Sequence, residues 1–235
     1  MVDRTPSGIP GLDEMIEGGF PRGASILVAG VAGTCKSIFC MQYVYNGVDQ
    51  YGEPGLYVTL EEHVKNIAWN VQSFGWDIHK YQENKMLNIY RMNLGSENTI
   101  QDQIKDELEI IGGIVKDQGI QRLVIDSTTA LTIWMKNKGE IRNLLFNFVD
   151  KLKDLDCTTL LTSQAKPGKH SMSAFEVEEY VVDGVISLFF NPPYRHLLVR
   201  KMRGTNHDKN IHPFELGAEG VRVKSKETVL WEALK

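Results

Sequence analysis

Short apolar runs alternate with longer amphipathic segments along most of the chain. Apolar runs of about four to eight residues are typical of strands buried on both faces, and apolar residues at helical spacing indicate helices with one buried face. The predicted strands are residues 26–29, 56–60, 86–90, 120–127 and 157–164. The predicted helices are residues 38–44, continuing to an end near Gly47, and residues 63–74, 99–118 and 140–154, with short helices at 13–17 and 174–180.

The pattern changes near residue 184. Residues 184–190 and 195–201 flank Asn191-Pro192-Pro193-Tyr194 and predict a hairpin, and residues 213–216 and 220–223 predict a smaller terminal pair. Strands that alternate with helices imply a parallel sheet, to which hairpins add antiparallel strands. The sequence therefore predicts an α/β fold in one domain, residues 1–235, with a mostly parallel central sheet flanked by helices and a C-terminal antiparallel hairpin.

Composition narrows the class of protein. The chain has 235 residues, of which 42% are apolar and 24% charged, as in globular domains. No apolar run approaches the roughly 18–20 residues that span a bilayer, and the N-terminus lacks the apolar core of a signal peptide. The three cysteines have no C-x-x-C spacing, which predicts neither a disulfide framework nor a zinc site. We expect a cytoplasmic protein without a membrane partner.

One loop combines glycine, lysine and serine between a predicted strand and a predicted helix. It has the layout of a phosphate-binding P-loop, in which backbone N–H groups and the helix N-terminus surround the phosphates. Lys36 would reach the β- and γ-phosphates, and the Ser37 hydroxyl would ligate Mg²⁺. The expected nucleotide-binding residues of the loop are Gly30, Val31, Ala32, Gly33, Thr34, Cys35, Lys36 and Ser37. An ordinary strand–turn–helix with an incidental Lys-Ser is the weaker alternative.

Cys35 departs from the usual P-loop pattern, G-x-x-x-x-G-K-[ST], which has glycine at this position. A Cβ must fit there, where backbone and phosphate approach closely. The thiol would also lie at a helix N-terminus beside Lys36, a setting that lowers a thiol pKa and favours oxidation. Redox control of ATP binding is one interpretation, and simple tolerance of a small side chain is the favoured one.

Three carboxylates follow predicted strands. Asp126 closes an apolar strand and would hold a Mg²⁺-bound water opposite Ser37, with capping of the next segment as its alternative role. Glu61 and Glu62 follow another strand, at the sheet edge where ligands of α/β proteins bind. Hydrolysis of ATP needs a carboxylate that orients the attacking water. Because adjacent side chains of an extended segment point in opposite directions, only one of the pair, Glu62 by preference, is expected to face the phosphate. A solvated helix start is the alternative.

Later strand ends carry further candidates. A polar triplet, residues 162–164 (TSQ), ends the strand that follows Asp126. Gln164 or Ser163 would sense the γ-phosphate, unless the triplet is a satisfied strand terminus. Lys201 and Arg203 lie two residues apart at a strand end, so both can face one side. Because the P-loop already supplies Lys36, cations placed in this way are typical of groups that act in a neighbouring subunit's site. Alone, they would indicate a solvated charged edge.

Seven blocks together are more specific than the P-loop by itself. They are residues 8–13 (GIPGLD), 18–23 (GGFPRG), 30–37 (GVAGTCKS), 57–62 (YVTLEE), 73–77 (SFGWD), 124–127 (VIDS) and 201–207 (KMRGTNH). With these blocks, nearly the whole chain resembles a KaiC-type domain of the RecA superfamily of P-loop ATPases.

The resemblance implies a RecA-like core that binds ATP or ADP with Mg²⁺ between adjacent subunits of a homo-oligomeric ring, most often a hexamer. The residues implied to serve catalysis and Mg-ATP are Lys36, Ser37, Glu61, Glu62 and Asp126. It further implies that Lys201 and Arg203 reach the γ-phosphate of the neighbouring subunit, with His207 near its nucleotide. The clock protein of this family carries two such domains and this chain has one, so a circadian role is not implied.

Three functions stay open. The leading one is a slow, Mg²⁺-dependent ATPase that works as a ring. The second is a nucleotide-dependent scaffold without significant turnover, whose closed state an unknown protein partner reads. The third is a RecA-like accessory protein of DNA repair or recombination, with residues 135–138 and 166–170 as candidate loops for single-stranded DNA. A net charge of −4 and a pI of about 5.9 argue mildly against the third.

Overall fold

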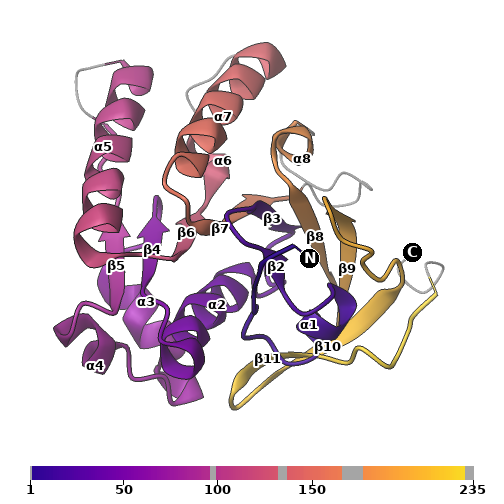
Figure 1. Cartoon of the computed structure of the whole chain (residues 1–235). Coiled ribbons are helices and arrows are strands. Elements are labelled where there is room, and N and C mark those ends of the chain that lie inside the picture. The colour runs from indigo at the N-terminus through magenta and orange to yellow at the C-terminus, as the bar shows by residue number, and fades with distance from the viewer. Residues whose placement is uncertain (1, 96–98, 132–136, 166–176, 231–235) are drawn as a thin grey trace.

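The structure is a computed structural model and describes residues 2–95, 99–131, 137–165 and 177–230 (Figure 1). The strands are β1 (Arg4–Thr5), β2 (Phe20–Pro21), β3 (Ser25–Gly30), β4 (Gly55–Thr59), β5 (Leu87–Arg91), β6 (Arg122–Asp126), β7 (Thr158–Gln164), β8 (Gly184–Asn191), β9 (Tyr194–Met202), β10 (Ile211–Gly217) and β11 (Gly220–Val223). The helices are α1 (Leu12–Met15), α2 (Lys36–Tyr51), α3 (Val64–Val71), the 3-10 turn η1 (Gln72–Phe74), α4 (Ile78–Glu83), α5 (Ile100–Gln118), α6 (Thr128–Leu131), α7 (Lys138–Lys153) and α8 (Glu178–Val181).

Within the described residues, nine strands form one sheet in the order β11-β10-β9-β8-β3-β7-β6-β4-β5, and β1 pairs with β2 separately. Neighbouring strands run parallel from β8 through β3 to β5, and antiparallel from β8 to β11. The predicted α/β fold, with a mostly parallel sheet and antiparallel C-terminal strands, is confirmed. The two C-terminal hairpins are joined, because β10 also pairs with β9 and extends the same sheet.

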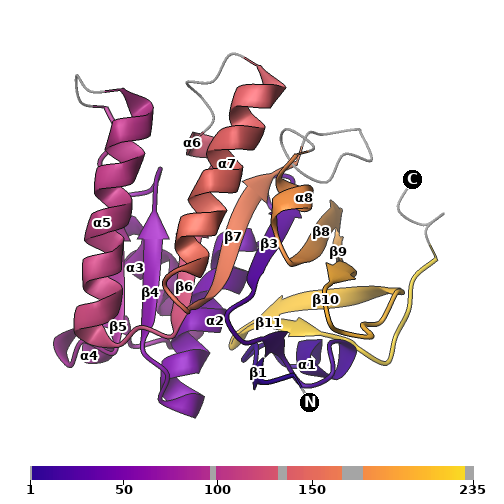
Figure 2. The ribbon, with the colours of Figure 1, turned by 45° about the horizontal axis from the view of Figure 1, so that its top comes forward.

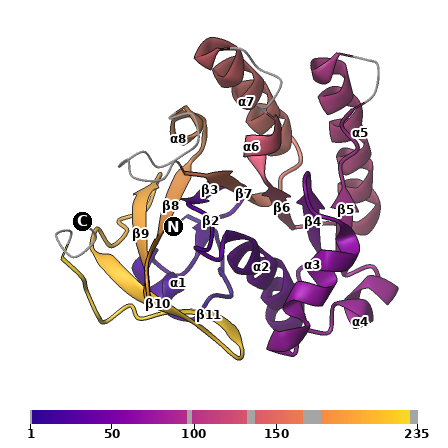
Figure 3. The ribbon, with the colours of Figure 1, turned by 180° about the vertical axis from the view of Figure 1, so that it is seen from behind.

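Helices cover both faces of the sheet (Figures 1, 2 and 3). Helix α2 packs with α1 and α3 on one face, and α5 and α7 stand side by side on the other. The central strand β3 is buried along its whole length. Its Ile26 and Val28 join the core under α2, whereas Leu27 and Ala29 join the core under α5 and α7. Burial on both faces explains why the sequence of β3 is a continuous apolar run.

Helix α2 is longer than the sequence predicts. It continues past Gly47 to Tyr51 and ends at Gly52, which adopts a left-handed φ of 65°. Position 47, inside the helix, is a glycine because the side chain of Arg122 crosses the helix there. A Cβ on Gly47 would lie 2.2 Å from Arg122 Cδ. Gly47 therefore marks a close approach between two elements, and not the end of a helix.

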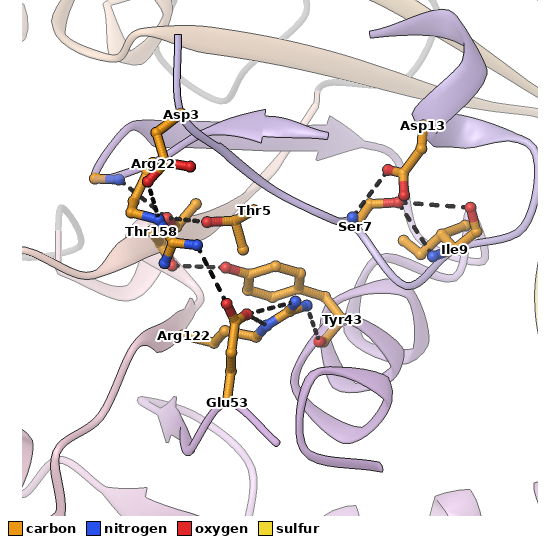
Figure 4. Close-up of polar contacts among 11 residues, drawn as sticks. Asp3, Thr5, Ser7, Ile9, Asp13, Arg22, Tyr43, Glu53, Arg122 and Thr158 are labelled. Carbon is orange, nitrogen blue, oxygen red and sulfur yellow. Dashed lines mark hydrogen bonds and ion pairs between the residues drawn. The ribbon is translucent and has the colours of Figure 1, made fainter. Parts of the chain in front are cut away.

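Arg122 is fully buried at the start of β6 and contacts α2 and the loop between α2 and β4 (Figure 4). Its guanidinium lies 2.7 Å from a carboxylate oxygen of Glu53, donates to the Tyr43 carbonyl at 3.0 Å and lies 4.8 Å from the centre of the Tyr43 ring. Arg22 reaches the other oxygen of Glu53 at 3.4 Å. Since a buried cation is costly unless it is paired, Glu53 is needed to keep Arg122 in the core.

Near the N-terminus the structure has a pair of short strands that the sequence analysis does not predict. Arg4–Thr5 pair with Phe20–Pro21 as β1 and β2. The Thr5 hydroxyl lies 2.9 Å from that of Thr158, so this segment is tied to the start of β7 (Figure 4). The segment is therefore held against the end of the sheet at which the parallel strands begin.

Other boundaries differ by a few residues. The predicted helix 63–74 consists of α3 followed by η1. Of the predicted helix 174–180, the structure shows the part in α8. Residues 174–176 lie outside the described residues, and so do residues 135–136 and 166–170 of the candidate DNA loops. Among the helices that the structure describes, none has both the length and the apolar character needed to cross a membrane.

Candidate functional site

The Gly30–Ser37 loop connects the carboxyl end of β3 to the N-terminus of α2, as the sequence predicts. The Lys36 ammonium donates hydrogen bonds to the carbonyl oxygens of Gly30 at 2.8 Å and Val31 at 3.0 Å. The buried Thr34 hydroxyl also donates to the Val31 carbonyl, at 2.8 Å. Burial lowers the pKa of Lys36, and the nearby charge of Asp126 partly opposes this effect. The loop therefore accepts hydrogen bonds from two of the three N–H groups of its own lysine.

A cleft of about 630 Å³ opens beside this loop and brings together most of the predicted site residues. Those that line it are Ala32, Gly33, Cys35, Lys36, Ser37, Glu61, Glu62, Asp126 and Gln164. Its apolar wall is formed by Ile38, Met41, Ile67, Val71 and Leu216. A cleft with a polar, lysine-bearing end and an apolar wall suits a ligand that combines phosphates with a flat ring.

Cys35 adopts a left-handed backbone conformation with a φ of 67°. This is the conformation that glycine adopts most easily, so the departure from the usual P-loop sequence falls on a position where a side chain carries strain. Burial raises the pKa of the Cys35 thiol, and the charges of Arg195 and Lys36 only partly oppose it. The sequence-based expectation of a lowered thiol pKa is therefore wrong, because removal from water outweighs the neighbouring cations.

Asp126 ends β6 between its two neighbouring strands, β4 and β7. The hydroxyl of Tyr57, from β4, donates to Asp126 Oδ2, and the hydroxyl of Thr162, from β7, donates to Oδ1. Both donors are buried, with 1% of Tyr57 and none of Thr162 exposed. The carboxylate is thus held from both sides. The sequence analysis assigned no role to Tyr57 or Thr162.

Glu61 and Glu62 both line the cleft. That only one of them, Glu62 by preference, faces the phosphate stays a prediction. Strand β4 already ends at Thr59, and the alternation of side chains along an extended strand does not reach the pair. The Thr59 hydroxyl accepts from the backbone N–H of Glu62 at 3.0 Å and fixes this turn. Glu61 accepts a hydrogen bond from Ser127 at 3.0 Å, whereas Glu62 accepts one from Asn70 at 2.8 Å.

Gln164 lies at the end of β7, directly beside Gly30 in the parallel pair of β3 and β7. Its backbone N–H donates to the Thr129 hydroxyl at 3.0 Å, and the residue is exposed in the cleft. Ser163 faces the other way and donates to the buried carboxylate of Glu178 at 2.9 Å. Gln164 is therefore the member of the polar triplet that a nucleotide phosphate in the cleft could reach.

Lys201 and Arg203 do not lie at the P-loop of this chain. The Lys201 ammonium donates to the carbonyls of Glu179 at 3.1 Å and Val182 at 2.6 Å, and Arg203 donates to Asp183 at 3.1 Å. Burial, together with the charge of Arg203, lowers the pKa of Lys201.

His207 follows in the next loop, where its Nδ1 lies 2.9 Å from the carbonyl oxygen of Asp208. The backbone of Asp208 is in turn hydrogen-bonded to the carbonyl of Met15, in α1. The structure therefore brings the predicted lysine, arginine and histidine to a different part of the fold from the cleft.

Arg195 is a cation of the cleft that the sequence analysis missed. The register of β8 and β9 places it opposite Phe190, over whose ring its guanidinium lies at 4.5 Å. Its Nε donates to the carbonyl of Gly33 at 3.3 Å. The signal available in the sequence was weak, because one arginine in a hairpin is usual and only the strand pairing places it at the loop.

The donor set of the cleft fits a divalent cation that arrives with a nucleotide. Ser37 and Asp126 supply one hydroxyl and one carboxylate, and Mg²⁺ in such sites keeps waters and takes its other ligands from phosphates. In the described ranges, no group of three or more His, Cys, Asp or Glu side chains could hold a metal on its own. The residues therefore fit a metal held jointly with phosphates.

Comparison with known proteins identifies relatives over almost the whole chain. The family model described as "ATPase: KaiC" matches residues 5–228. UPF0273 protein PF1931 of Pyrococcus furiosus is 34% identical over 95% of this chain and 94% of its own length. Circadian clock oscillator protein KaiC of Prochlorococcus marinus is 33% identical over 94% of this chain, which spans 46% of that protein. The crystal structure of the KaiC-like protein PH0186 from Pyrococcus horikoshii superposes with a TM-score of 0.84 at 38% identity, covering 95% of this chain and 99% of that one.

Proposed function

Because the chain belongs to the KaiC-like family of ATPases, with the RecA-type P-loop fold of that family, we propose that it binds Mg-ATP as a single ATPase domain. In this proposal it hydrolyses ATP slowly at the interfaces of a homo-oligomeric ring, most simply a hexamer. The observation that carries the proposal is the division of the site: the loop and carboxylates share one cleft, whereas Lys201 and Arg203 lie elsewhere in the subunit.

The cleft residues divide into binding and chemistry. Lys36 exchanges its carbonyl contacts for the β- and γ-phosphates, and the loop N–H groups surround the β-phosphate. Ser37 and Asp126 would hold Mg²⁺, which when bound neutralises charge on the phosphates. Gln164, beside Gly30 at the end of β7, would contact the γ-phosphate. All four of these side chains line the same cleft.

The glutamate pair, Glu61 and Glu62, is proposed to activate the attacking water. Glu62 is the proposed base, since it lies in the cleft with one oxygen held by Asn70 and could orient a water toward the γ-phosphate. Glu61 is tied to Ser127, the residue next to Asp126, and is proposed to support the metal side of the site. Because Asn70 holds Glu62 and Ser127 holds Glu61, the two carboxylates occupy different positions in one cleft.

Sheet register supports a role for Lys201 and Arg203 in the site of a neighbouring subunit. Met202 pairs with Gly184, and Gly184 pairs with Ile26 near the start of β3. The P-loop begins after Gly30, four residues further along β3, which is about 13 Å at the rise of a strand. Arg203 therefore lies near the opposite end of the sheet from its own P-loop. We propose that it reaches the γ-phosphate held by the adjacent subunit.

Arg203 is better placed for this role than Lys201. Its side chain is 60% exposed and has one carboxylate partner, whereas Lys201 is held by two carbonyl oxygens. Lys201 is proposed to hold residues 179–182 in each subunit and to reach the nucleotide only if these hydrogen bonds open. His207 would lie close to the same neighbouring nucleotide. All three residues would then contribute to an interface between copies of the chain.

Subunit mixing tests the proposal. Lys36→Ala removes the phosphate contact and Arg203→Ala removes the proposed contribution to the neighbour, so each variant alone should release no phosphate from Mg-ATP. If subunits are mixed in equal amounts, about one interface in four combines an intact loop with an intact arginine, and about a quarter of the wild-type rate should return. The control is Arg222→Ala, an arginine with a similarly exposed side chain paired with Glu219, which should behave as wild type. Mixtures that stay inactive would refute a shared site.

One observation favours a scaffold as second candidate. The left-handed Cys35 places a Cβ in the loop where glycine is usual, and this could permit binding while hindering turnover. In that case wild type would bind ATP and assemble without releasing phosphate, and Cys35→Gly would restore release. An unknown protein partner would then read the nucleotide-bound form. Equal, measurable release by both proteins would exclude this explanation.

A further inference from the structure

Tyr57 has a hydroxyl group that the proposed reaction does not yet use. The residue lies in the middle of β4, is 1% exposed, and faces α2 together with the other residues of that core. A buried hydroxyl requires a hydrogen-bond partner, and the backbone often supplies it. Here the hydroxyl instead donates to Asp126 Oδ2, at the edge of the cleft.

Ser37 lines the same cleft as Tyr57 and Asp126. The Tyr57 hydroxyl therefore contacts one of the two side chains that fit a divalent cation, in the cleft that both of them line.

Asp126 is held on its other oxygen as well. Thr162 donates to Oδ1 from β7, and β7 and β4 are the two strands that flank β6. A carboxylate that accepts one hydrogen bond on each oxygen has a fixed plane, and each oxygen keeps a lone pair for a metal-bound water. Partners of this kind orient metal ligands and affect metal affinity without touching the metal.

We propose that Tyr57 is a positioning residue for the divalent cation: its hydroxyl fixes one oxygen of Asp126, and Thr162 fixes the other. This inference rests on the proposed binding of Mg-ATP. It assigns to Tyr57 a contribution to metal affinity that is separate from the affinity of the P-loop for the nucleotide itself.

The test compares metal binding with metal-free nucleotide binding. Mn²⁺, observed by electron paramagnetic resonance, is titrated into protein saturated with a non-hydrolysable ATP analogue, and affinity for the analogue is measured separately in EDTA. Tyr57→Phe keeps the ring and removes the hydroxyl. We expect it to weaken Mn²⁺ binding by about tenfold, the lower end for residues that orient metal ligands, with analogue affinity in EDTA unchanged.

Tyr43→Phe is the matched control. Tyr43 is equally buried, and its hydroxyl donates to the Thr158 carbonyl at 2.8 Å, away from the residues that line the cleft. It should leave Mn²⁺ affinity unchanged. Thr162→Val is the second test variant and should weaken Mn²⁺ binding in the same direction as Tyr57→Phe. Thermal unfolding of each variant identifies any that is not folded.

The outcomes separate this inference from the proposed function. Unchanged Mn²⁺ affinity in folded Tyr57→Phe would overturn the role of Tyr57, and so would an equal loss of analogue affinity in EDTA, since that would mean a distorted loop. If Tyr57→Phe does not fold, unchanged Mn²⁺ affinity in Thr162→Val overturns the clamp on Asp126, and weakened affinity supports it. A wild-type protein that binds no nucleotide would overturn the proposed function and this inference with it.

Discussion

Arg203 donates a hydrogen bond to Asp183 at 3.1 Å, near the end of the sheet opposite the P-loop. Asp183 also lies 2.9 Å from the Lys153 ammonium and accepts from the backbone N–H of Ser25. One carboxylate therefore joins α7, the start of β3 and the segment that is proposed to reach the neighbouring subunit. Replacing Asp183 should therefore affect both the stability of the fold and the placement of Arg203.

The charge of Asp183 gives a prediction about pH. Burial by itself would raise the pKa of Asp183, but hydrogen bonds from Lys153 and Ser25 and the charges of Lys153 and Arg203 lower it below 3.8. A lowered folded-state pKa adds stability that is present above pH 4 and is lost as the pH falls through the folded value. The melting temperature of wild type should therefore exceed that of Asp183→Asn at pH 7 and pH 5, and the difference between the two should shrink at pH 3.

Asp154→Asn is the control for Asp183→Asn. Asp154 pairs with Lys151 at 3.3 Å, but both side chains are about two-thirds exposed. Exposed ion pairs contribute little to stability, so this variant should have the same melting temperature as wild type at every pH. A constant difference between wild type and Asp183→Asn from pH 7 to pH 3 would contradict the assigned pKa.

Gly47→Ala should destabilise the fold. The added Cβ would lie 2.2 Å from Arg122 Cδ and 2.4 Å from its Nε, and Arg122 is fixed by Glu53. Forcing this buried side chain to move should cost about 2–3 kcal/mol in the free energy of unfolding, measured with denaturant. Gly113→Ala in α5 is the control, because no heavy atom lies within 4 Å of its Cβ and the change should stabilise by up to about 1 kcal/mol. Equal effects of Gly47→Ala and Gly113→Ala on the free energy of unfolding would contradict the close contact between Gly47 and Arg122.

Cys35 should react slowly with thiol reagents. Of the three cysteines it is the one that is not buried, so maleimide labelling of the folded protein should report on it alone. Its raised pKa leaves less thiolate at neutral pH, so labelling should be slower than that of a free thiol at pH 7 and should accelerate toward pH 9 and above. ATP should protect it. Rapid labelling at pH 7 would instead support redox control of the loop.

Glu62→Gln should separate binding from hydrolysis. Removing a general base lowers turnover by about 100-fold or more, whereas the phosphate contacts of Lys36 stay in place. Phosphate release should therefore fall by that factor while Mg-ATP affinity is retained. Glu61→Gln, with its link to Ser127, should reduce turnover less. The reverse order of the two variants would assign the base to Glu61.

The fold and the loop were predictable because their signals are local. A continuous apolar run, a glycine-containing turn and a Lys-Ser pair lie within a dozen residues of one another, and strand β3, the loop and α2 follow them in order. Asp126 could be placed in the same way, since an acidic residue that closes an apolar strand must lie at the carboxyl edge of a parallel sheet.

The features that sequence reasoning missed depend on contacts between distant elements. Gly47 resembles a helix end until Arg122, 75 residues later, is placed against it. Arg195 reaches the P-loop only through the register of β8 and β9. The Cys35 thiol was expected to be acidic from its neighbours in sequence, but its pKa is set by how much water the surrounding chain excludes. None of these quantities has a local pattern.

A loop and an arginine that lie near opposite ends of the sheet would give the proposed ATPase a rate law unlike that of a self-sufficient protein. If catalysis needs two chains, specific activity per milligram must fall on dilution, and this fall must begin where the assembled form starts to dissociate. The cell could then set ATP consumption by how much of the protein it makes, without altering any residue of the chain.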